Sequence, residues 1–254
     1  MSKRRRGGGV QRAQIGKFPR RAQFRRARGV HQFRRRTRRN VRTGGFLGIE
    51  TKFYDTFLLD RNLTKPTDGS GGECDQSATV GPTTIAQGDG ESNRDGRKCV
   101  VKSCYVTGII EVPKQADQIA SDIGGTVFVA LVQDTQTNGA LLNSEDVFTN
   151  PGGLDHLATS PLRNMQYTNR FKVLARKLIQ LPQAELVYDG TNIEQGGFHV
   201  PFMLSWRGVM PMLFTGTTSD ISNSVTNSLH IVAYCSDTTQ APAMSYNCRV
   251  RFVG

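Results

Sequence analysis

The residues with the clearest chemical potential are the Arg and Lys side chains at the start of the chain. Residues 1–42 contain 17 of the 33 Lys and Arg residues and no Asp or Glu. An Arg guanidinium donates paired, charge-assisted hydrogen bonds to phosphate. The segment is therefore predicted to bind a dense polyanion, either nucleic acid or an anionic membrane surface. We assign nucleic-acid contact to Arg4, Arg5, Arg6, Arg20, Arg21, Arg25, Arg26, Arg28, Arg34, Arg35, Arg36, Arg38, Arg39 and Arg42.

The rest of the chain has the opposite charge balance. The whole chain carries a formal charge of +12, but residues 43–254 hold 16 basic and 21 acidic residues, a net charge of −5. A run as charged as residues 1–42 buries too little apolar area to offset its chain entropy. The sequence therefore predicts two parts: a disordered basic arm at 1–42 and one folded domain at 43–254.

Two further readings of the arm stay open. Its clusters at 3–6 and 34–39 suit a nuclear localisation signal as well as a nucleic-acid patch. The aromatic residues Phe18, Phe24 and Phe33 either stack on unpaired bases or anchor the arm under the body.

The folded part that must hold this arm has the alternation typical of β-strands. Long polar connections separate the apolar runs, and one short helix is expected after Asn143 or Ser144. Because no helical stripe lies between strands, parallel βαβ units are excluded. The predicted fold is all-β: an antiparallel sandwich, and specifically a single jelly roll. The expected strands are 46–59, 98–112, 126–132, 168–181, 185–188, 198–206, 210–215, 228–236 and 244–253, and Pro201 and Pro211 leave the boundaries between 185 and 215 open.

The strand at 168–181 carries a second group of candidate contacts. Its period-two pattern places Phe171, Val173, Ala175, Ile179 and Leu181 on one face. The other face is expected to be a cationic ledge, which either contacts nucleic acid or is an ordinary solvated face. Its basic residues are Arg170, Lys172 and Arg176.

Catalytic, metal and cofactor chemistry find little support in the sequence. The chain contains no H-E-x-x-H, no G-x-S-x-G and no Walker loop, and its four His residues are far apart. Five cysteines without a C-x-x-C spacing indicate buried thiols in a reducing compartment. Residues 89–95 resemble half of a calcium loop but lack its sixth-position Gly and twelfth-position Glu. We therefore predict a non-enzyme with no catalytic residues, no metal and no cofactor.

Membrane insertion and secretion are also unexpected. No apolar run approaches the roughly 20 residues needed to span a bilayer. The basic start is not followed by the apolar stretch of a signal peptide. The protein is therefore expected to be soluble and made in the cytosol.

Several stretches resemble the capsid proteins of circular Rep-encoding single-stranded DNA viruses, circovirus-like and satellite-necrosis-virus-like coats among them. The resemblance rests on the Arg-rich start, the strand at 46–59 and the three stretches Tyr167–Leu174, Ser228–Tyr234 and Arg249–Val253. It implies a jelly roll assembled as a homo-oligomeric T=1 icosahedral capsid, with the arm inside on single-stranded DNA. Loops at 60–96, 113–124, 136–166 and 216–227 would face outward or lie between subunits.

The resulting hypothesis is a self-assembling capsid protein that packages single-stranded nucleic acid, with DNA favoured by the resemblance alone. Its expected locations are the virion and, during assembly, the host nucleus, with host nuclear import machinery as a partner; the sequence identifies no host receptor. The alternatives are a cellular basic-tailed binder, such as a ribosomal or nuclear protein, and a viral nuclear shuttle or movement protein that forms no shell.

Overall fold

The computed structural model describes residues 50–64, 72–112, 125–149, 161–181, 186–188, 193–195, 198–236 and 241–254. The chain divides into two units, Met1–Phe46 and Leu47–Gly254. All 14 arm arginines assigned to nucleic-acid contact lie outside the described residues, as does the loop at 113–124. The disorder of the arm and its binding role therefore stay predictions.

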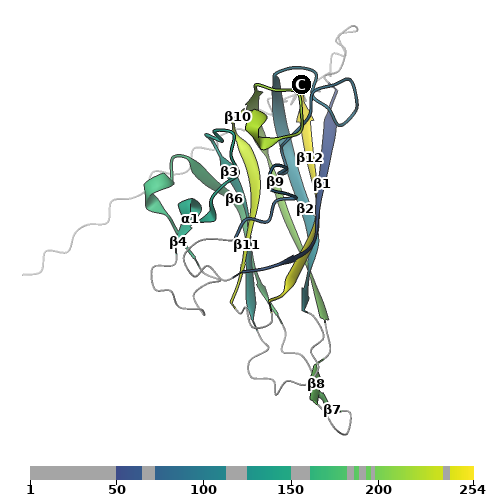
Figure 1. Cartoon of the computed structure of the whole chain (residues 1–254), viewed down its shortest axis with the longest axis vertical. Coiled ribbons are helices and arrows are strands. Elements are labelled where there is room, and N and C mark those ends of the chain that lie inside the picture. Colours follow the sequence, from purple (N-terminus) through teal and green to yellow (C-terminus); the bar gives the residue numbers. More distant parts are fainter. Residues whose placement is uncertain are drawn as a thin grey trace, which may run out of the picture. The chain divides into compact units, whose positions relative to one another are not determined.

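The larger of two main sheets contains five strands in the order β1-β12-β2-β9-β10. Figure 1 shows its long strands running side by side. Every ladder in the sheet is antiparallel. The strands are β1 (Lys52–Asn62), β12 (Ala243–Val253), β2 (Lys98–Val112), β9 (Phe198–Phe214) and β10 (Ser224–Thr226).

The second main sheet is antiparallel as well and has the order β11-β3-β6. Two small antiparallel pairs, β4 with β5 and β7 with β8, complete the described strands. The all-β prediction is therefore confirmed. The strands outside the large sheet are β3 (Thr126–Asp134), β4 (Phe148–Thr149), β5 (Leu162–Arg163), β6 (Phe171–Gln180), β7 (Leu186–Tyr188), β8 (Ile193–Gln195) and β11 (Ser228–Cys235). The described helices are α1 (Ser144–Val147), η2 (Met165–Tyr167) and η3 (Ile221–Asn223).

An apolar core joins the two main sheets into a sandwich. Alternate residues of the large sheet, such as Val106 and Val250, pack in one cluster with Val129 and Ile231 of the smaller sheet. Burial of this area is the main favourable contribution to folding. The opposite face of the large sheet is left exposed, so its polar residues alternate with buried ones along each strand.

The smaller sheet buries both faces of β3 and β11, whereas several residues of its third strand, β6, are exposed. Its second face packs against α1 and β4, where the Phe148 ring meets the Phe128 ring edge-on at 5.2 Å between centroids. All eight residues of β11 are consequently buried. This double burial explains why β3 and β11 are almost continuously apolar instead of alternating.

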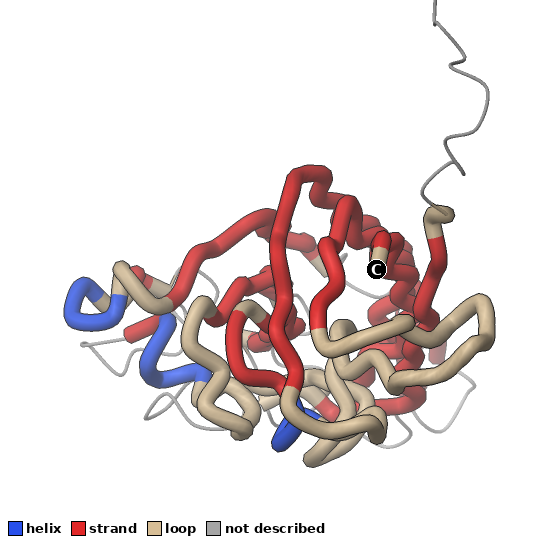
Figure 2. Tube along the Cα trace, turned by 90° about the horizontal axis from the view of Figure 1, so that it is seen from above, coloured by secondary structure: helices blue, strands red, loops and turns tan. Residues whose placement is uncertain are grey.

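The loop between β1 and β2 closes one end of the sandwich through a buried arginine. The Arg94 guanidinium donates to the carbonyls of Ile85, Gly96 and Gly216 and lies 4.3 Å from the centroid of the Phe214 ring. Burial lowers the pKa of this guanidinium. Figure 2, which views the molecule from above, shows loops in tan across the ends of the strands. Of the long polar connection expected at 60–96, residues 60–62 belong to β1 and residues 72–96 form a loop that packs on the sandwich.

Candidate nucleic-acid interface

Arg170, one of the three cationic residues predicted for the ledge, is held in an internal ion pair. Its Nε and Nη2 atoms donate to the two carboxylate oxygens of Asp134 at 3.0 and 2.8 Å. Asp134 is fully buried, and its hydrogen bond raises the pKa of Arg170. The guanidinium also lies 4.7 Å from the centroid of the Phe171 ring. Arg170 therefore compensates the buried charge of Asp134 and links the start of β6 to the end of β3.

The predicted ledge is wrong because β6 contains a bulge. Leu131 of β3 pairs with Ala175 and the adjacent Val132 pairs with Val173, which leaves one extra residue, Leu174, in β6. An extra residue reverses the side-chain parity beyond it. Phe171 and Val173 accordingly pack in the second apolar cluster, whereas Ala175, Ile179 and Leu181 pack in the core between the sheets.

The same reversal separates the other two ledge residues. Lys172 lies opposite Gln133 and Arg176 lies opposite Ala130, and these two β3 residues point to opposite faces of the sheet. Both basic side chains are exposed. A nucleic-acid contact by either one stays a prediction, but the two do not form a joint surface with Arg170.

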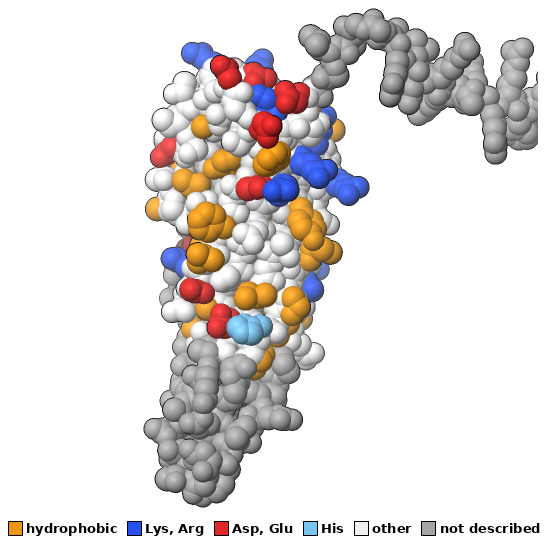
Figure 3. All heavy atoms as spheres, turned by 90° about the vertical axis from the view of Figure 1, so that its right-hand side faces the viewer, with side chains coloured by type: hydrophobic (Ala, Val, Ile, Leu, Met, Phe, Trp, Pro, Cys, Tyr) orange, Lys and Arg blue, Asp and Glu red, His pale blue; other side chains and the backbone are white. Residues whose placement is uncertain are grey.

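A different set of cations gathers on the exposed face of the five-stranded sheet. Strand register places Arg251 of β12 opposite Ser103 of β2, which in turn lies opposite Arg207 of β9. In the next row that faces the same way, Arg249 lies opposite Tyr105. Figure 3, which views the molecule from the side on which β1 lies, shows Lys and Arg side chains beside hydrophobic and acidic ones.

These rows border a depression of about 710 Å³, which we call the basic hollow. Its lining contains four cations and no carboxylate. The lining residues are Thr51, Lys102, Ser103, Cys104, Tyr105, Ser205, Trp206, Arg207, Arg249 and Arg251. Lys102 is an extra residue of β2 relative to β12, because Arg251 pairs with Ser103 and the adjacent Phe252 pairs with Val101. This bulge leaves Lys102 exposed beside the arginines.

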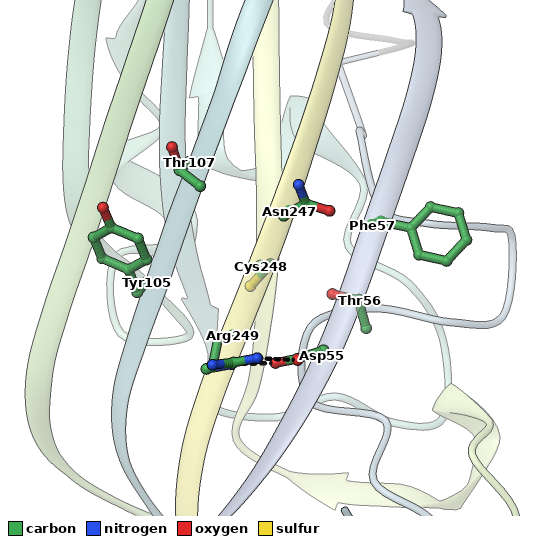
Figure 4. Close-up of a pocket in the computed structure, with 8 residues that line it drawn as sticks. All are labelled: Asp55, Thr56, Phe57, Tyr105, Thr107, Asn247, Cys248 and Arg249. Atoms are coloured by element: carbon green, nitrogen blue, oxygen red, sulfur yellow. Dashed lines mark hydrogen bonds and ion pairs between the residues drawn. The ribbon is translucent and has the colours of Figure 1, made fainter.

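Arg249 is the one cation of the hollow that is fixed by an acid in the described structure. Its Nε and Nη2 atoms donate to the Asp55 carboxylate at 2.7 and 2.6 Å, which raises the pKa of Arg249 (Figure 4). The guanidinium also lies 4.9 Å from the centroid of the Phe53 ring. Because Asp55 and Phe53 both orient it, Arg249 forms a fixed edge of the hollow.

The other three cations have no such partner among the described residues. Within the part of the chain that the structure describes, no carboxylate forms an ion pair with Lys102, Arg207 or Arg251. These three neighbouring cations repel one another. Together they create a local positive potential on a domain whose total charge is negative.

Tyr105 joins the basic hollow to a second depression of about 370 Å³ on the same sheet face. The second depression is lined by Asp55, Thr56, Phe57, Tyr105, Thr107, Asn247, Cys248 and Arg249 (Figure 4). The Tyr105 side chain is 46% exposed, and its hydroxyl donates to the Met203 sulfur at 3.1 Å. An exposed aromatic ring next to a group of cations suits phosphate contact combined with base stacking.

A Ser–His–Asp arrangement lies elsewhere, in the smaller sheet. The His230 Nδ1 atom lies 2.7 Å from an Asp75 carboxylate oxygen, and its Nε2 atom lies 2.6 Å from the Ser228 hydroxyl. Thr137 donates to the same hydroxyl at 2.9 Å. Ser228 is completely buried and His230 is 1% exposed, so a substrate cannot reach the hydroxyl. The arrangement ties the Asp75 loop to β11 and is structural.

The calcium-like stretch at 89–95 is also engaged internally. The Lys52 ammonium donates to Asp95, and this hydrogen bond raises the pKa of Lys52. Arg94 points into the closed end of the sandwich, where its guanidinium contacts backbone carbonyls. Among the described residues, no three His, Cys, Asp or Glu side chains gather in a cluster that could hold a metal ion.

The sequence contained only part of the signal for the basic hollow. The alternation of the last strand places Asn247, Arg249 and Arg251 on one side, and this parity is observed. Lys102 and Arg207 come from strands about 100 residues apart, and their register depends on bulges in β2 and β9. Such bulges have no period-two signature, so sequence reasoning missed the convergence.

No protein-family model matches the chain, and neither does any curated protein. Within the described residues, no helix is long and apolar enough to cross a membrane.

Proposed function

We propose that this chain is a viral coat protein that assembles into a small closed shell and packages a single-stranded genome. The observation that carries the proposal is the union of two parts in one chain. A segment of 42 residues contains 17 basic and no acidic residues, and the β-sandwich that follows it belongs to a region of net charge −5. A polyanion-binding arm on an acidic body is what a shell subunit with an internal genome requires.

The strand pairing supports a jelly roll as the fold of that subunit. In a jelly roll, four nested antiparallel pairs join strand one with eight, two with seven, three with six and four with five. Here β1 pairs with β12, β2 with β9, and β3 with β6. The remaining pair, strand two with strand seven, corresponds to a short segment at Glu73, which forms an antiparallel bridge with Val232 of β11. Jelly rolls are frequent in viral capsids, but they also occur in lectins and cupins.

Multiplicity gives the arm its packaging role. One arm binds phosphates with strong salt dependence and little sequence preference. Many arms fixed on one shell act at a high effective concentration, which allows modest individual contacts to retain a whole genome. The choice of DNA, the T=1 icosahedral geometry and the nuclear stage of assembly follow from the resemblance to circular Rep-encoding virus capsids. Import into the nucleus would use the same Arg clusters.

Nuclease protection tests this proposal against a binder that forms no shell. The full-length chain is purified with its bound nucleic acid, treated with DNase and RNase, and sedimented. A coat protein retains nuclease-resistant nucleic acid in a single fast-sedimenting peak, and digestion after extraction identifies it as DNA or RNA. A nuclear shuttle or other basic-tailed binder would lose its nucleic acid and sediment slowly, which would refute packaging.

A further inference from the structure

We propose that the basic hollow is a second binding site for single-stranded nucleic acid, with phosphates on Lys102, Arg207 and Arg251 and a base stacked on Tyr105. This inference rests on the proposed packaging function and adds a site in the folded domain to that of the arm. Sequence reasoning assigned binding in the folded domain to Arg170, Lys172 and Arg176 instead.

Three of the four cations of the hollow lack, among the described residues, the internal partners that other arginines have. Arg170 neutralises Asp134, Arg94 binds carbonyls, and Arg249 pairs with Asp55. Lys102, Arg207 and Arg251 have no carboxylate partner among the described residues, although they line one depression together. Their mutual repulsion opposes folding, and a bound polyanion removes that repulsion.

Their spacing suits a chain of phosphates better than a single anion. Arg251 and Arg207 lie in one row with Ser103 between them, so their backbones are two strand spacings apart, roughly 10 Å. Long flexible side chains at that separation reach successive phosphates of a strand that crosses the sheet. The serine side chains of the lining, Ser103 and Ser205, add neutral hydrogen-bonding groups to the hollow.

The aromatic wall indicates a single strand in place of a duplex. Tyr105 is held beside Met203 by its hydroxyl, and nearly half of its side-chain surface remains exposed. An unpaired base can stack on such a ring, whereas the bases of a duplex are already stacked on one another. Phe53 is less suited to this role, because Arg249 occupies one side of its ring.

The test compares two charge-matched triple variants of the full-length chain. The first removes the cations of the hollow, as Lys102→Gln, Arg207→Gln and Arg251→Gln. The control, Arg61→Gln, Arg97→Gln and Lys177→Gln, removes two arginines and one lysine that are exposed and lie outside the hollow and outside the predicted contacts. The probe is a fluorescent oligothymidylate, and its affinity is measured over a range of NaCl concentrations. Urea unfolding of each variant verifies that it remains folded.

Each lost phosphate contact on a single strand lowers the slope of log affinity against log salt by about 0.7. The hollow variant is therefore expected to lose about 2 from the slope, and the control variant is expected to match the unmodified chain. Tyr105→Leu is expected to keep the slope and to weaken binding about ten-fold through lost stacking. An iodouracil-substituted oligonucleotide should photo-crosslink to the peptide that contains Tyr105.

The outcomes separate this inference from the proposed function. If the unmodified chain does not bind the oligonucleotide, packaging itself is refuted. If it binds with a steep slope that the hollow variant retains, only the hollow is refuted. Equal losses of slope in the two triple variants would show that binding depends on total charge and not on the hollow, which would refute the inference. A hollow variant that keeps its slope but no longer assembles would identify the hollow as a contact between copies, which also overturns the inference.

Discussion

Asp75 shows at the scale of one residue how a buried carboxylate organises this fold. One of its oxygens lies 2.7 Å from His230 Nδ1, and the other accepts the backbone N–H of Ile231 at 3.1 Å. A buried polar group is tolerated when such partners satisfy it, and removing one partner leaves the others unpaired. Asp75 thus adds side-chain contacts to the backbone hydrogen bonds, such as Cys74 N–H to Ile231 O, that bind the loop after β1 to β11.

We expect Asp75→Ala to lower the free energy of unfolding by about 3 kcal/mol, because His230 and the Ile231 N–H lose their acceptor inside the protein. The matched control is Asp55→Ala, which breaks an exposed pair and should cost about 1 kcal/mol or less. Urea unfolding followed through Trp206, the single tryptophan, measures both. Similar losses in the two variants would contradict a structural role for the buried network.

The thiols provide a second test at the residue scale. All five cysteines are buried, as the sequence predicted. Burial raises the pKa of Cys74 and Cys99 to about 12, against 9.0 in an unperturbed thiol. The pKa of the Cys104 thiol is also raised. The causes are a hydrogen bond with Cys248, with 3.5 Å between the sulfur atoms, and burial. The fold therefore holds these thiols in their protonated, unreactive form.

We expect iodoacetamide at pH 8 to leave Cys74 and Cys99 unmodified in the folded protein and to label both in concentrated urea, as read by mass spectrometry. The raised pKa also fixes a direction for stability. The contribution of these two thiols to the free energy of unfolding is complete below pH 9. It is lost as the pH rises from 9 towards 12, because the thiols of the unfolded chain release their protons first. Rapid labelling of the folded protein would show that the two sites are open to solvent.

At the scale of elements, strands that alternate cleanly were predictable and their irregularities were not. The expected strand at 98–112 coincides with β2, and the strand at 244–253 differs from β12 by one residue. The expected strands at 198–206 and 210–215 are one continuous strand, β9, which contains both Pro201 and Pro211. For most of its length β9 pairs with β2 alone, so a proline N atom on the other side needs no partner.

The bulges had the larger consequence for where the exposed cations lie. One extra residue at Leu174 separates Lys172 from Arg176, and one at Lys102 adds a cation to the basic hollow. Neither insertion changes the apolar pattern enough to be read from a single sequence. The candidate site was therefore predictable only for Arg249 and Arg251, whose strand is regular.

The arm is the element whose removal we expect to separate folding from packaging. Every residue of the described core lies at position 54 or later, so deletion of residues 1–42 should leave the urea midpoint within error. The same deletion removes 17 cations and should sharply reduce the nucleic acid that copurifies with the protein. The ratio of absorbance at 260 and 280 nm measures this content. An unchanged ratio would place the main binding site outside the arm.

At the scale of the whole molecule, charge and fold divide the tasks between the two parts of the chain. The sandwich supplies a rigid body with a filled core, and the arm supplies most of the cationic charge. The basic hollow adds a smaller cationic site on the body itself. A rigid body can repeat in a shell, and repetition converts weak phosphate contacts into strong retention of a long strand.

Assembly is the central claim, and negative-stain electron microscopy of the purified full-length chain tests it most directly. The account predicts closed particles of one uniform diameter, present at low and moderate salt and dissociating only when high salt screens the contacts with the genome. The unmodified protein and the hollow variant should form particles of the same size. A preparation that contains only monomers or dimers across all salt concentrations and pH values would contradict the account.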